Sequence, residues 1–209
     1  MKTDEIIDFY FEATQIREIG RYSHLQDRFR NNVAEHCFHM TILADKLIEH
    51  YKLDLDFRKV VRYIYLHDWG EIGLKQDIVA FAKQQGNNHE IESQKEFERA
   101  KKSLSKFGLE QDISDLVDYD NLATEEAKFA MAVDKLECCL FIAKHGLDNI
   151  IDSCIVDGKF ENSAYDCIES FVDFEVNYPN RAIKLYPPLK DFAEAIMERL
   201  KAQAAKYKK

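Results

Sequence analysis

Apolar positions recur three and four residues apart along almost the whole chain, which is the period of an amphipathic α-helix. Runs of alternating apolar and polar residues, which would indicate strands, are scarce. The pattern predicts helices over residues 4–15, 32–51, 56–69, 90–106, 111–119 and 124–144. We therefore expect an all-α protein.

Local signals define where two of these helices begin. Asn32 is followed three residues later by Glu35, which is the spacing of a capping box. Thr124 is a good N-cap residue, and two glutamates follow it. Beyond residue 147 shorter helical segments alternate with proline-containing breaks and end in a basic helix. These signals predict a helical core followed by a helical extension.

Length and composition predict one folded domain. The chain has 209 residues, of which 46% are hydrophobic and 32% charged, and this composition excludes a disordered protein. No low-complexity linker divides it. We expect a single domain over residues 1–209, a helical bundle with a motif-bearing core at about 18–146 and a C-terminal helical extension at about 147–209.

The charge distribution restricts the class of partner. The formal net charge is -9 and no basic stripe interrupts it, which argues against duplex nucleic acid or a membrane surface as partner. A small anionic ligand would need local positive charge. The clearest local excess is a segment with four arginines, namely Arg17, Arg21, Arg28 and Arg30.

Cysteine usage and the first residues predict a cytoplasmic protein. The five cysteines lack CxxC spacing, so neither a disulfide framework nor a cysteine-rich zinc site is expected. The N-terminal residues carry acids within their apolar run and do not resemble a signal peptide. No stretch approaches the roughly 20 apolar residues that span a bilayer.

Two histidines and two aspartates form the candidate chemistry. His67 and Asp68 lie at the end of an apolar helix, where the helix dipole favours a cation. His36 precedes them on another helix, and Asp134 borders the apolar stripe of the long helix. Taken alone, Asp134 is more often explained by a salt bridge, and His36 by a core or capping role. Together they form a nitrogen and oxygen set that suits a divalent metal with open positions.

Three segments around these residues carry a resemblance to a known family. They are RYSHLQDRFRNNVAEHC at 21–37, YLHDWGEIGLKQDI at 65–78 and TEEAKFAMAVDKLE at 124–137. In composition and spacing they resemble the HD-domain phosphohydrolases of the YfbR-like 5'-deoxyribonucleotidase branch. The resemblance covers somewhat more than half of the chain and implies a helical HD-domain bundle.

The resemblance implies a role for each matching residue. One divalent ion, which could be Mn, Co, Fe, Ni, Zn or Mg, would be bound by His36, His67, Asp68 and Asp134. Glu71 would act on the attacking water or the leaving group, and Arg21 would contact the substrate phosphate or sugar. Glu35 fits a cap better than a ligand. Lys83 could also hold the phosphate.

The chain departs from the family at two positions. The family's Arg-Trp pair is Arg21-Tyr22 here, so Tyr22 would face the sugar. The aspartate that follows the catalytic glutamate is displaced by one residue, so that Gln76 holds its place and Asp77 comes next. A one-residue loop insertion would return Asp77 to a catalytic position, whereas a rigid register would put Gln76 there.

The leading hypothesis is hydrolysis of (deoxy)ribonucleoside 5'-monophosphates to nucleoside and phosphate through attack by water bound to the metal. Glu71 and Asp77 would be catalytic. Two alternatives are an HD hydrolase of another small phosphate ester or signalling nucleotide, and a non-catalytic module that binds a metal or nucleotide. The resemblance also allows a homodimer.

Overall fold

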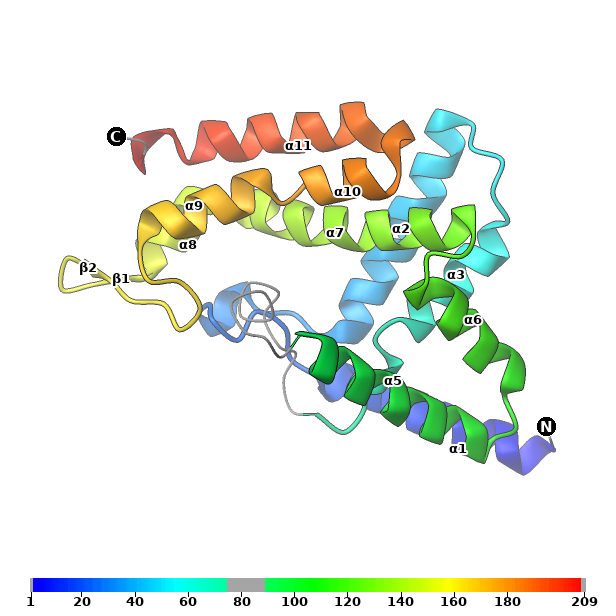
Figure 1. Cartoon of the computed structure of the whole chain (residues 1–209). Helices are drawn as coiled ribbons and strands as arrows, with labels where there is room; N and C mark the ends of the chain where they lie inside the picture. The colour runs from blue at the N-terminus through cyan, green and yellow to red at the C-terminus, as the bar shows by residue number, and fades with distance from the viewer. Residues whose placement is uncertain (1, 75–88, 208–209) are drawn as a thin grey trace. The chain divides into compact units, whose positions relative to one another are not determined.

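The computed structural model describes residues 2–74 and 89–207, which are helical apart from one small sheet (Figure 1). The α-helices are α1 (Thr3–Ala13), α2 (Val33–Tyr51), α3 (Phe57–Leu66), α5 (His89–Lys106), α6 (Glu110–Asp120), α7 (Glu125–His145), α8 (Leu147–Ser153), α9 (Ile168–Asn177), α10 (Asn180–Leu185) and α11 (Lys190–Gln203). The prediction of an all-α protein is confirmed.

Short elements complete the described chain. The 3-10 helices are η1 (Thr14–Glu18), η2 (Asp27–Phe29), η3 (Trp69–Glu71), η4 (Pro187–Leu189) and η5 (Ala205–Tyr207). Strands β1 (Ile155–Val156) and β2 (Lys159–Phe160) form an antiparallel hairpin. None of the helices described is both long and apolar enough to cross a membrane.

Contacts divide the chain into two compact units. Unit 1 comprises Met1–Arg21 and Asn31–Ala130, and unit 2 comprises Tyr22–Arg30 and Met131–Lys209. Helix α7 begins in unit 1 and continues into unit 2. The single domain over residues 1–209 stays a prediction.

In unit 1, the start of α2 confirms the predicted capping box. The Glu35 backbone N–H donates to the Asn32 side chain at 2.9 Å, and the Asn32 N–H donates to the Glu35 carboxylate at 3.4 Å. Two backbone N–H groups at this helix end, which have no partner within the helix, are thereby hydrogen-bonded. Four buried residues spaced three or four apart then form one inward face, namely His36, Met40, Ala44 and Leu47. The cap therefore fixes the register that turns His36 inward.

Helix α3 is shorter than predicted. Asp56 caps its start by accepting from the Arg58 N–H at 2.9 Å, and the helix ends at Leu66 instead of Trp69. Arg62 of α3 binds two carboxylates of α6. Its guanidinium lies 3.1 Å from Asp112 and 2.6 Å from Asp115. The one guanidinium bridges two largely buried carboxylates, and these contacts orient α3 against α6.

Unit 2 packs α9 and α10 against α11, which runs beside them in Figure 1. The segment Tyr22–Arg30 belongs to this unit. The ring of His24 lies 5.8 Å from that of Tyr165 and 6.4 Å from that of Phe171, and Asn162 donates to the His24 carbonyl at 3.0 Å. These contacts fasten the segment to unit 2.

His24 is buried as a neutral ring. It is 8% exposed, and among the described residues neither ring nitrogen has a hydrogen-bond partner. Burial, together with the charge of Arg30, lowers the pKa of His24 from 6.5 to about 4. Folding therefore opposes protonation of this imidazole.

We predict that His24→Leu makes the protein less sensitive to acid. Between pH 6.5 and 4 the unfolded chain protonates His24 while the folded protein does not, so the contribution of this residue to stability falls as the pH falls. Between pH 7 and 4.5 the wild type should lose about 2 kcal/mol more unfolding free energy than the variant. Urea unfolding at both pH values measures the difference. Equal losses in the two proteins would contradict the prediction.

Candidate metal centre

His67 and Asp68 lie directly after α3 and face each other. His67 Nδ1 is 2.7 Å from the Ile64 carbonyl oxygen, and because that oxygen can only accept, Nδ1 carries the proton. In the neutral ring Nε2 then has a lone pair, and it lies 3.0 Å from Oδ2 of Asp68. Two electron-rich atoms this close repel each other unless a positive charge lies between them, either a second ring proton on His67, as in an ion pair, or a bound cation. The pair therefore fits a bound cation.

His36 contributes a second imidazole in unit 1. It is fully buried, its ring centroid lies 5.5 Å from that of His67, and one ring nitrogen of each lies within 4.8 Å of the other. Helices α2 and α3 thus bring His36, His67 and Asp68 together within one unit. Neutral imidazole nitrogen and carboxylate oxygen are both good ligands for divalent transition metals.

Arg21 lies beside the same carboxylate. Its Nη1 atom is 3.7 Å from Asp68 Oδ2, and only 8% of its side chain is exposed. Burial alone would raise the pKa of Asp68, but the positive charges of His67, Arg21 and His36 hold that pKa well below its usual range. Asp68 is therefore an ionised carboxylate, as a metal ligand must be.

The turn after Asp68 carries Glu71. In η3 the Glu71 N–H donates to the Asp68 carbonyl at 3.0 Å, and the Leu74 N–H donates to the Glu71 carbonyl at 2.8 Å. The Glu71 side chain is buried, with 4% of the residue exposed. One 3-10 turn thus joins a predicted ligand to the predicted acid–base residue.

Helix α5 holds this turn. Arg99 Nε donates to the Gly70 carbonyl at 2.7 Å, and the Trp69 indole donates to Ser103 Oγ at 3.0 Å. A Cβ on Gly70 would lie 2.1 Å from the Glu96 carbonyl oxygen, so no side chain fits there. Since Glu96, Arg99 and Ser103 are three and four residues apart, one face of α5 makes all three contacts.

Helix α1 also supports the contact between Trp69 and Ser103. Figure 1 shows α1 and α5 running side by side. Ser103 donates to the Glu12 carboxylate, and the ring of Phe9 stacks on Trp69 with centroids 5.1 Å apart. No sequence motif marks these supporting residues. Their only sequence signal is helical spacing.

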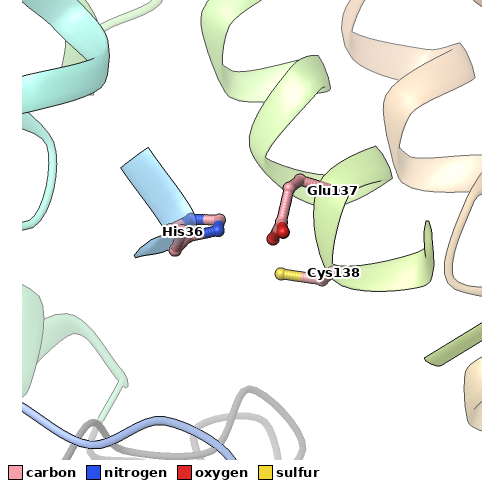
Figure 2. A group of neighbouring side chains, drawn as sticks. All are labelled: His36, Glu137 and Cys138. Carbon is pink, nitrogen blue, oxygen red and sulfur yellow. The ribbon is translucent and has the colours of Figure 1, made fainter. Parts of the chain in front are cut away.

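Asp134 lies on α7, in the part that belongs to unit 2. Its side chain is 10% exposed, Lys135 Nζ lies 2.6 Å from Oδ2, and Cys138 Sγ lies 3.9 Å from Oδ1. Figure 2 shows Glu137 and Cys138 of α7 with their carboxylate and thiol turned the same way, and it also draws His36 of α2. The contact with Lys135 is the salt bridge that was expected for Asp134 taken alone.

The remaining predicted residues fall into two groups. Tyr22 belongs to unit 2, has a left-handed backbone with φ 57°, stacks on Phe141 at 4.3 Å and donates to the Cys138 carbonyl at 3.4 Å. Gln76, Asp77 and Lys83 lie outside the described residues. The question of whether Gln76 or Asp77 holds the catalytic position stays as the sequence leaves it.

Comparison with known proteins identifies the family. The pattern of the HD domain family matches residues 13–168, about three quarters of the chain. The chain therefore belongs to the HD-domain family.

A solved structure shares the fold. It is a protein from Magnetospirillum magnetotacticum MS-1 described as a predicted metal-dependent phosphohydrolase, and the match covers 96% of this chain and 93% of that one with a TM-score of 0.68. The two sequences are 20% identical, so the likeness concerns the fold. No curated protein matches the chain.

We predict that Gly70→Ala disturbs the turn that carries Asp68 and Glu71. The new Cβ would collide with a backbone oxygen that cannot rotate away, so η3 and α5 must move apart. We expect a loss of about 1–3 kcal/mol in unfolding free energy and weaker binding of Mn²⁺. Chemical unfolding and calorimetric titration with Mn²⁺ measure the two effects.

Gly20→Ala is the matched control, because a Cβ at Gly20 has no atom within 4 Å. It should leave both measurements close to those of the wild type. If Gly70→Ala behaves like Gly20→Ala, then α5 does not hold the turn as described.

Proposed function

We propose that this protein is a metal-dependent phosphohydrolase that converts (deoxy)ribonucleoside 5'-monophosphates to nucleoside and phosphate. The observation that carries the proposal is the close approach of His67 Nε2 to Asp68 Oδ2, with Glu71 one turn further on. Membership of the HD-domain family and the description of the structural neighbour support the reaction class. The nucleotide substrate rests on the resemblance of the three motif segments.

The proposed metal ligands are His36, His67, Asp68 and Asp134. The first three converge within unit 1, and Asp134 follows Ala130, the last α7 residue of that unit, by one helical turn. A largely buried carboxylate with charged neighbours is a suitable ligand. When bound, a divalent ion would lower the pKa of a coordinated water towards about 7 and offset the charge of the phosphoryl oxygens.

Glu71 is proposed as the residue that moves the proton. Its carboxylate is buried and held by a rigid turn, and it is not one of the proposed ligands. It can take a proton from the attacking water or return one to the departing 5' oxygen, a role that typically contributes about 10² to 10⁴ in rate. Asp77 is the second candidate for this role. No serine, cysteine or aspartate nucleophile is required.

Arg21, Tyr22 and Lys83 are proposed to hold the substrate. A guanidinium can bind two phosphate oxygens at once, and Lys83 would add a second positive charge. Tyr22 would face the sugar, where its ring is smaller than the tryptophan of the resembling family. The homodimer and the cytoplasmic location stay predictions.

The proposal is tested by phosphate release from a panel of nucleoside monophosphates, cyclic dinucleotides and guanosine polyphosphates, each with several divalent metals. We expect the highest kcat/KM for 5'-monophosphates and no activity after chelation. In ¹⁸O-labelled water the label should appear in phosphate, because water attacks phosphorus directly. Label in the nucleoside, or a trapped phosphoenzyme, would refute direct attack. Release only from other phosphate esters would favour the alternative hydrolase.

We predict that Glu71→Gln lowers kcat by about 10² or more while the bound metal is retained, because the amide keeps the shape of the side chain but cannot transfer the proton. Steady-state kinetics and elemental analysis check the two effects. Glu98→Gln, an exposed change on α5, is the control and should alter neither. Loss of metal in Glu71→Gln would make Glu71 a ligand, and an unchanged kcat would favour a non-catalytic module.

A further inference from the structure

The proposed cation and phosphate sites meet at one side chain, Arg21. We propose that Arg21 couples the two ligands: it opposes binding of the divalent cation alone and favours the cation when a phosphate is also bound. This inference rests on the proposed function, since it concerns the metal and phosphate of that site. It assigns Arg21 a role beyond substrate contact.

The geometry that carries the inference is a shared oxygen. Oδ2 of Asp68 lies 3.0 Å from His67 Nε2 and 3.7 Å from Arg21 Nη1. The carboxylate that the cation would bind is therefore already beside a permanent positive charge. Arg21 is 8% exposed and Asp68 20% exposed as side chains, so water screens this charge only in part.

The backbone of Arg21 is fixed close to the metal residues. Its N–H donates to the Asn31 carbonyl at 2.8 Å, and the preceding Gly20 forms a bridge with Asn32, the cap residue of α2. The same short stretch therefore positions His36 and Arg21. The backbone of Arg21 cannot move far from the start of α2 without breaking this link.

The charge of Arg21 should lower the affinity of the site for a divalent cation when no phosphate is bound. Arginine stays protonated at every accessible pH, so a divalent cation bound at Asp68 would meet a like charge that cannot be neutralised by losing a proton. A phosphate beside both groups would supply negative charge to each of them. The cation should then bind more tightly with phosphate than without it. Reciprocity requires that the phosphate also bind more tightly with the cation.

A simpler role for Arg21 makes the opposite prediction. If Arg21 only orients Asp68 for coordination, its removal should weaken cation binding. If it couples the two ligands, its removal should strengthen binding of the cation alone. The two roles are therefore distinguished by whether removal of Arg21 weakens or strengthens binding of the cation alone.

The experiment is calorimetric titration of the full chain with Mn²⁺, with and without inorganic phosphate, for the wild type, Arg21→Met and Arg17→Met. Methionine removes the charge and retains much of the apolar bulk. Arg17 is the matched control, because its exposed side chain pairs with Glu18 and its replacement changes the net charge equally. Circular dichroism and thermal unfolding confirm that each variant is folded.

We expect Arg21→Met to bind Mn²⁺ alone about tenfold more tightly than the wild type. Phosphate should improve Mn²⁺ affinity about tenfold in the wild type and less than about twofold in Arg21→Met. Arg17→Met should match the wild type in both titrations. Should Arg21→Met fail to fold, Arg21→Gln replaces it. That variant also removes the charge but keeps a polar side chain, so it should likewise bind Mn²⁺ alone more tightly and lose most of the phosphate effect.

Three results would overturn the inference. Weaker binding of Mn²⁺ alone by Arg21→Met would show an orienting role, and an equal phosphate effect in wild type and variant would show no coupling. If Arg21→Gln is the variant used, a full phosphate effect overturns the inference. Failure of the wild type to bind Mn²⁺ at all would instead overturn the proposed function, and the inference with it.

Discussion

The arrangement of unit 1 depends on one mostly buried carboxylate, that of Asp68. A carboxylate removed from water costs several kcal/mol unless positive charge surrounds it, and here His67 and Arg21 lie at its Oδ2 atom. Helix α3 ends at Leu66, so that His67 and Asp68 lie in the turn between α3 and η3. The charged groups of the site therefore follow directly on the end of α3.

Much of the fold could be predicted from apolar spacing and caps. The predicted α2, α5 and α7 agree with the structure within a few residues, and the Asn32–Glu35 capping box is present as expected. The hairpin of β1 and β2 was missed, although its turn, Asp157-Gly158, is a strong local signal with both residues at positive φ. Its strands are only two residues long, too short to produce a recognisable alternation of apolar and polar positions.

The candidate site could be predicted only in part. The motifs identified His36, His67 and Asp68, and unit 1 brings them together. The resemblance implied Arg21 as a substrate contact, but its position beside Asp68 was not predicted, because an arginine in a basic segment has many partners available. The need for glycine at position 70 could not be predicted either, since only the packing of α5 reveals why no Cβ fits there. Such contacts join distant segments and leave no local pattern in the sequence.

The attachment of η3 to α5 has a consequence for hydrogen exchange. Arg99 and Ser103 bind the turn directly, and Gly70 lies against the backbone of Glu96, so α5 cannot open without releasing the turn. The amides of α5 and of η3 then belong to one cooperative unit that exchanges together. A cation bound at Asp68 would slow exchange along α5 as well, although no residue of that helix is a proposed ligand. In this fold the protection of a supporting helix reports the occupancy of the site.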